Sequence, residues 1–205
     1  MRTISFAIRS EWRSQQIASK SFVPENFVTG AIFAGGESSR FGSPKVNALL
    51  NNEEFGFRIA RSMRQSGVDK ILLVGGSESD ASRWNLIFAL DEVSGSGPFA
   101  ALLAALHKSD TPILLTMPCD VPWIDSESCR QLSSIDAEFD VQVATTDSPQ
   151  WLCSAWRTSA IQHLEQQFAN GERAIHRAVI GLKVSYLQLS PSSLRNVNTP
   201  DDLRT

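Results

Sequence analysis

The sequence predicts an α/β fold: a single domain with a mostly parallel central sheet and helices on both faces. Short apolar runs bounded by Gly, Pro, Ser or Asp recur along the chain, as buried parallel strands do. Helical stretches with apolar residues one turn apart lie between these runs. The chain has 205 residues, 42% hydrophobic and 20% charged, which is enough for one domain with a substantial core.

The elements can be justified in chain order, starting at residue 27. The first four predicted strands are the apolar runs Val28–Phe33, Lys70–Val74, Leu86–Leu90 and Pro112–Met117. Phe55–Arg64 is a predicted helix because its apolar residues recur one turn apart. Pro98–His107 is another because it begins with Pro, a residue favoured at the first position of a helix. Later elements are the strands Asp140–Ala144, Leu152–Trp156 and Val184–Leu189 and the helices Thr158–Ala169 and Arg173–Ile180. This alternation predicts a Rossmann-like open sheet, which binds ligands beyond the carboxyl ends of its strands.

Composition and charge argue against several classes of protein. The 19 basic and 22 acidic side chains give a net charge of -3, so no basic surface indicates a nucleic-acid partner. The longest apolar runs, such as Phe99–Leu106, are far shorter than the roughly 20 residues of a membrane span. Three cysteines are too few and too scattered for a disulfide framework or a zinc site. We therefore expect a cytoplasmic protein without nucleic-acid or membrane partners.

Met1–Asn26 differs from the rest of the chain. Its apolar residues are scattered among charged ones and form no continuous apolar core of a secretory signal. We interpret residues 1–26 as an N-terminal extension on the surface of the domain, or the product of an early start codon. An arm that binds a partner chain is the weaker alternative. The domain itself is expected to span residues 27–205.

A glycine-rich loop follows the first predicted strand, with the sequence Ala34-Gly35-Gly36-Glu37-Ser38-Ser39-Arg40-Phe41-Gly42-Ser43-Pro44-Lys45. The glycine pair allows the backbone to turn with positive φ and to approach a ligand closely. Exposed amides and hydroxyls could then cradle phosphate oxygens between the cations Arg40 and Lys45. The spacing fits neither a Walker A loop nor the dinucleotide fingerprint. An ordinary β-to-α turn with solvated charges is the alternative.

The whole loop resembles the signature A-G-G-x-S-x-R-M-G-x-x-K of nucleotidyltransferases that activate small phosphorylated molecules. The residues in register are Ala34, Gly35, Gly36, Ser38, Arg40, Gly42 and Lys45, with Phe41 at the Met position. Within that superfamily the sequence is similar to the molybdenum cofactor guanylyltransferases, the MobA family. The resemblance implies a fold like that of the nucleotide-diphospho-sugar transferases.

Three further segments match the family in the same order. Asp91–Ala100 resembles an aspartate followed by a G-x-G-P-L-A-G turn, and Pro118–Pro122 resembles P-C-D-x-P. Asn196–Leu203 resembles the closing N-x-N-T-P-E-D-L, in which Thr199 and Pro200 would start a short helix. Taken singly, the first segment could be a capped strand-to-helix turn, the second an ordinary turn and the third a helix cap. Together with the loop they extend the resemblance over about residues 27–204.

The resemblance implies a role for each matched residue. Catalytic roles fall on Arg40, Lys45 and Asp120, with Asp120 as the ligand of Mg²⁺, which commonly takes only one or two protein carboxylates. The nucleotide would be bound by Ala34, Gly35, Gly36, Lys45, Asp91 and Asp120. The acceptor molecule would be bound by Arg40, Gly42, Arg173, Asn196 and Asn198.

The implied reaction transfers GMP from GTP to the phosphate of molybdopterin and releases pyrophosphate. GTP and molybdopterin are then the small-molecule partners, and transient contact with molybdoenzymes or their chaperones is a further implication. A related transferase that uses CTP or another triphosphate on a different acceptor is the nearer alternative. A non-catalytic nucleotide-binding relative is the farther one.

The sequence also departs from the family pattern. Pro44 stands where the family usually has Asp before the lysine, and Val46 and Asn47 delay the leucines that normally follow it. Gly75-Gly76-Ser77 replaces an asparagine-bearing stretch that often helps the family to read guanine. Nothing in these residues identifies the base.

Overall fold

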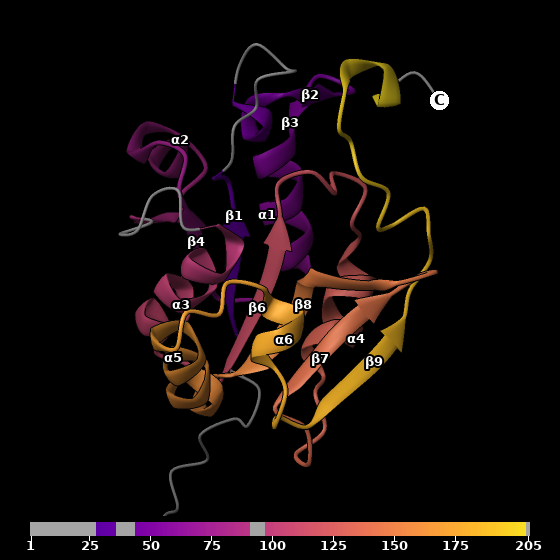
Figure 1. Ribbon diagram of the computed structural model, residues 1–205. Helices are drawn as coiled ribbons and strands as arrows, with labels where there is room; N and C mark the ends of the chain where they lie inside the picture. The colour runs from indigo at the N-terminus through magenta and orange to yellow at the C-terminus, as the bar shows by residue number, and fades with distance from the viewer. Residues whose placement is uncertain (1–27, 36–43, 91–96, 204–205) are drawn as a thin grey trace, which may run out of the picture.

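The structure, a computed structural model, describes residues 28–35, 44–90 and 97–203 (Figure 1). Its main sheet has seven strands in the order β5-β4-β1-β6-β8-β7-β9. The strands are β1 (Val28–Phe33), β4 (Lys70–Val74), β5 (Ile87–Ala89), β6 (Ile113–Pro118), β7 (Val141–Thr145), β8 (Pro149–Arg157) and β9 (Val184–Gln188). Neighbours pair in parallel except at β8, which is antiparallel to both β6 and β7. The predicted α/β fold with a mostly parallel sheet is therefore confirmed.

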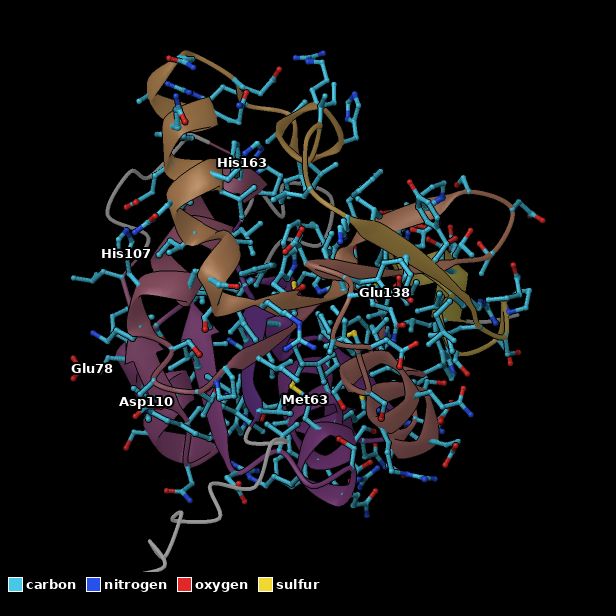
Figure 2. The ribbon with its side chains drawn as sticks, turned by 90° about the horizontal axis from the view of Figure 1, so that it is seen from below. Met63, Glu78, His107, Asp110, Glu138 and His163 are labelled. Carbon is cyan, nitrogen blue, oxygen red and sulfur yellow. The ribbon has the colours of Figure 1, made fainter. Side chains whose placement is uncertain are left out.

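Helices cover both faces of this sheet. One face packs against α1 (Phe55–Gln65), α2 (Glu78–Arg83) and α4 (Ser126–Ser133), and the other against α3 (Pro98–Lys108), α5 (Ile161–Ala169) and α6 (Ile175–Ala178). Successive side chains of a strand point to opposite faces of the sheet, so Ile32 packs in the core on the α1 side and Phe33 in the core on the α3 side. Figure 2 shows the two layers, with Met63 on the α1 side and His163 on the α5 side.

Short elements complete the described chain. A three-residue 3-10 helix, η1 (Lys45–Asn47), leads into the small antiparallel pair β2 (Leu49–Leu50) and β3 (Glu53–Glu54). Two more 3-10 helices are η2 (Thr158–Ala160) and η3 (Pro200–Leu203), and η3 is the short helix predicted at Pro200. In the described ranges no helix has the length and apolar character required to cross a bilayer.

Several predicted boundaries are wrong. The predicted strands 28–33 and 70–74 match β1 and β4, but β8 extends beyond the predicted 152–156 at both ends. The predicted helix 158–169 begins as a 3-10 turn. The predicted helix 173–180 shrinks to α6 because the Glu172 carboxylate accepts the amides of Arg173 (2.7 Å) and Ala174 (2.8 Å), which delays the helix start.

Two helices, α2 and α4, escaped prediction from the sequence. Both are mostly polar, so they lack the apolar periodicity that identifies α1. Side-chain caps mark their starts instead: the Asp80 amide donates to Ser77 Oγ (3.1 Å), and the Ser128 amide donates to Asp125 Oδ1 (2.8 Å).

Candidate active site

Several of the predicted site residues that the structure describes lie at one edge of the sheet. Because β1, β4 and β6 are parallel, their carboxyl ends lie together: Phe33, the last residue of β1, pairs with Val74 and with Pro118. In Figure 1 the arrow of β6 points toward the end of the molecule where α2, β2, β3 and the C-terminal segment are found. Open α/β sheets bind their ligands at this edge.

Lys45 and Asp120 meet at this edge. The Lys45 Nζ lies 3.8 Å from Asp120 Oδ2, and the two side chains are 18% and 26% exposed. Burial raises the pKa of Asp120 above its ordinary value, although the ammonium of Lys45 opposes the rise. The Cys119 amide donates to the Phe33 carbonyl (3.0 Å), which continues the ladder beyond β6 and fixes the backbone that carries Asp120. The structure thus pairs a cation and a partly buried carboxylate, the two groups that the sequence separates by more than seventy residues.

The start of the glycine loop lies against a second glycine turn. Ala34 donates its amide to the Val74 carbonyl (2.9 Å), so the two strand ends run on together. Gly75 has φ +74°, and a Cβ added there would lie 3.0 Å from the Gly35 amide nitrogen. The sequence marked Gly75-Gly76-Ser77 only as a departure from the family. A glycine pair directly after a buried strand, as at residues 35 and 36, was the signal that this turn also borders the site.

The C-terminal segment also reaches the site. Val197 is fully buried, and its amide donates to the Asp120 carbonyl (2.8 Å). Asn196 and Asn198 lie exposed on either side of Val197. The Asp202 carboxylate accepts the amides of Asn198 and Thr199, both at 2.8 Å, and these bonds lower its pKa. The structure therefore brings the two predicted asparagines beside the segment that carries Asp120.

Arg173 lies elsewhere, in the connection between α5 and α6. Its guanidinium donates to the carbonyls of Phe168 (2.8 Å) and Glu172 (2.7 Å) and stacks over the Phe168 ring at 3.9 Å. These contacts hold it on the α5 side of the sheet, and its acceptor-binding role stays a prediction. Gly36, Arg40, Gly42 and Asp91 fall outside the described residues, so their roles stay predictions too.

Asp120 is suited to an octahedral cation with few protein ligands. Among the described residues, no group of three or more His, Cys, Asp or Glu side chains is arranged to hold a metal ion. Asp120 as the carboxylate that the described residues offer fits Mg²⁺, which completes its coordination with phosphate oxygens and water. The described residues do not offer the three or four nitrogen and sulfur ligands that Zn²⁺ prefers.

The cysteines and histidines are not placed for nucleophilic chemistry. All three cysteines are buried, and burial raises the pKa of Cys119 and of Cys129 to about 12, so both remain thiols. His107 pairs with Glu165 (2.8 Å) between α3 and α5, and His163 Nε2 lies 3.0 Å from the Ala178 carbonyl oxygen. These are packing and surface roles.

A sheet of this topology, with glycines and a cation–carboxylate pair at its carboxyl edge, is typical of nucleotide-binding α/β domains. Residues 30–185 match the MobA-like NTP transferase domain, and the chain belongs to this family of nucleotidyltransferases. It is 30% identical over 194 residues to a protein of Chloroflexus aggregans named "Probable molybdenum cofactor guanylyltransferase", covering 86% of this chain and 92% of that protein.

Solved structures agree with this assignment. The chain resembles molybdopterin-guanine dinucleotide biosynthesis protein A from Archaeoglobus fulgidus with a TM-score of 0.71 and 25% identity, covering 86% of this chain and 95% of that one. The fold also matches Rv0371c from Mycobacterium tuberculosis, described as a complex with manganese, with a TM-score of 0.66, 18% identity and coverages of 87% and 96%. These similarities support the predicted fold.

Proposed function

We propose that the protein transfers GMP from GTP to the terminal phosphate of molybdopterin, forming a guanine dinucleotide and releasing pyrophosphate. The observation that carries the proposal is the Lys45–Asp120 pair at the carboxyl edge of the sheet, with the Asn196–Asn198 segment bonded to the same aspartate's backbone. The names of the relatives at 25–30% identity support guanine and molybdopterin as the substrates.

In this reaction an oxygen of the acceptor phosphate attacks the α-phosphorus of GTP. The bond from that phosphorus to the bridging oxygen of the β-phosphate breaks, and pyrophosphate leaves with the bonding electrons. No side-chain nucleophile is needed. The protein has to bring two polyanions together, hold them in line and offset the charge that grows on the leaving group.

The described residues divide this work between them. The Lys45 ammonium would bind triphosphate oxygens and neutralise part of their charge, while the Asp120 carboxylate would hold Mg²⁺. When bound, Mg²⁺ supplies Lewis-acid stabilisation of the phosphate oxygens. Burial penalises the ionised form of Asp120 and so raises its pKa, and a bound metal cation would relieve this penalty further than Lys45 does alone.

The remaining predicted residues complete the site. Ala34, Gly35 and Gly36 would offer backbone amides to the triphosphate. The Arg40 guanidinium would help to neutralise the negative charge of its phosphate oxygens. Asp91 would orient the nucleoside. Gly42, Arg40, Arg173, Asn196 and Asn198 are the candidates for binding the molybdopterin acceptor.

The proposal is tested by pyrophosphate release from GTP with molybdenum-loaded molybdopterin and Mg²⁺. We expect release that depends on both substrates and is strongly reduced by Asp120→Asn. Asp110→Asn is the matched control, because Asp110 is an exposed carboxylate paired with Lys70 (2.9 Å) just before β6, at the opposite end of that strand. No release with any of GTP, CTP, ATP or UTP would contradict the proposal, whereas release with CTP alone would change the base.

A further inference from the structure

Asp80 is a buried carboxylate that the proposed reaction does not use. It lies in α2, is 5% exposed, and each of its oxygens has a partner. Oδ2 accepts from Ser77 Oγ (2.7 Å) and from Asn47 Nδ2 (3.2 Å), and Oδ1 accepts from Arg83 Nη2 (2.9 Å). A carboxylate this deeply buried is costly unless it is fully paired. These bonds therefore hold together three segments: η1, the turn 75–77 and α2 itself.

The first of these segments is η1, which carries Lys45. Asn47, its last residue, donates to Asp80 and accepts from Arg83 Nη2 (3.2 Å), and Arg83 also binds Glu54 (2.7 Å) at the start of α1. Val46 is fully buried, and a Cβ added to Gly56 would lie only 2.7 Å from it. A single turn of 3-10 helix has little rigidity of its own. Side-chain anchors therefore set the position of η1.

The second segment is the glycine turn after β4. Ser77 caps α2 and donates to the same Asp80 oxygen that Asn47 reaches. This turn begins at Gly75, which lies against the Gly35 backbone at the start of the glycine loop. Asp80 therefore links the turn 75–77, which borders the glycine loop, to η1, which carries Lys45. In Figure 1, α2 lies toward the same end of the molecule as β2 and β3. Asn47 and Ser77 are both positions where the sequence departs from the family pattern.

We propose that Asp80 and Asn47 are positioning residues of the nucleotide site. Together they hold η1 against the turn 75–77, so that the Lys45 ammonium lies beside Asp120 and within reach of a bound triphosphate before the ligand arrives. Loss of either residue keeps the Lys45 side chain unchanged but lets the backbone that carries it move, and this movement weakens triphosphate binding. The inference rests on the proposed binding of triphosphate by Lys45.

A double-mutant cycle in the full chain tests this inference. The dissociation constant of magnesium-GTP is measured by calorimetry for wild type, Asn47→Ala, Lys45→Ala and the double variant. We expect Asn47→Ala to weaken binding about three- to tenfold in the wild-type background and less than about twofold in the Lys45→Ala background. The matched control is Gln142→Ala, which also removes a half-buried amide, one that donates to two carbonyls of α4. It should leave the affinity unchanged.

The outcomes separate this inference from the proposed function. If Lys45→Ala has no effect on affinity, the proposed role of Lys45 fails and the positioning role with it. If Lys45→Ala weakens binding but Asn47→Ala behaves like Gln142→Ala, only the positioning role is overturned. Equal effects of Asn47→Ala in both backgrounds would also overturn it, because the loss would then not act through Lys45.

An exchange of the two groups provides a second measurement if Asn47→Ala folds poorly. Asn47→Asp places a second carboxylate against Asp80 and should weaken both triphosphate binding and thermal stability. Adding Asp80→Asn restores one amide and one carboxylate beside Arg83, and should recover most of the affinity. If affinity stays low in this correctly folded double variant, the hydrogen-bonded pair is not what positions Lys45.

Discussion

Gly75→Ala adds one methyl group where the glycine turn after β4 meets the backbone of Gly35. Gly75 has φ +74°, a conformation that costs an L-residue about 1–2 kcal/mol. The added Cβ would lie 3.0 Å from the Gly35 nitrogen and 3.2 Å from the Gly35 Cα, both backbone atoms. Such atoms cannot rotate away as a side chain can. Either the turn or the glycine loop must therefore shift.

The two effects can be added to give an expected magnitude. Overpacking typically costs about 1–3 kcal/mol, so with the backbone conformation the total loss of unfolding free energy should be about 2–5 kcal/mol. Gly67→Ala is the matched control, because Gly67 has φ +96° with no atom within 4 Å of an added Cβ. It follows α1 and precedes β4, at the amino end of that strand, so it should cost only about 1–2 kcal/mol.

Urea unfolding measures the stability of both variants, and calorimetry measures their affinity for magnesium-GTP. We expect Gly75→Ala to lose more stability than Gly67→Ala and to bind the triphosphate at least about tenfold more weakly, since the start of the loop is displaced. Gly67→Ala should bind like wild type. Equal stability losses together with wild-type affinity for Gly75→Ala would refute the reasoning that this turn supports the phosphate-binding loop.

Three further predictions concern the charged pair and the N-terminal extension. Because burial raises the folded-state pKa of Asp120, its contribution to stability is present below its unfolded pKa and is lost as the pH rises through the folded pKa. Asp120→Asn should therefore melt at or above the wild-type temperature at pH 7 without ligand, and a lower melting temperature would contradict this expectation. The same variant should release pyrophosphate roughly a hundredfold more slowly, and unchanged turnover would contradict that expectation. Lys45→Ala should weaken magnesium-GTP binding about ten- to a hundredfold in calorimetry, the effect of losing one charge-assisted contact of roughly 1.5–3 kcal/mol, with little change in melting temperature. Removal of Met1–Asn26 should leave transfer activity intact, since every matched motif begins later; a folded but inactive truncated protein would show that the extension takes part in catalysis.

The sequence by itself determined the elements whose pattern is local. β1 and β4 were predicted at their observed bounds because an apolar run between polar or glycine residues is enough to identify a buried strand. The same reasoning placed Asp120 just beyond the end of a strand. The helices α2 and α4 could not be predicted in this way, because short polar helices depend on caps and on packing against the sheet rather than on an apolar stripe.

Only the tertiary structure decided how these segments are oriented and which of them contact one another. The apolar pattern of β8 does not predict the direction of this strand, because it is compatible with a parallel or an antiparallel neighbour. The bond from Val197 to the Asp120 backbone joins segments far apart in the chain, and so does the pairing of Asp80 with Asn47. Periodicity and local motifs report a residue's neighbours along the chain, whereas these contacts depend on how the strands are ordered in the sheet. The folded sheet thus brings Lys45 to Asp120, and the buried Asp80 ties the segment that carries this lysine to the glycine turn.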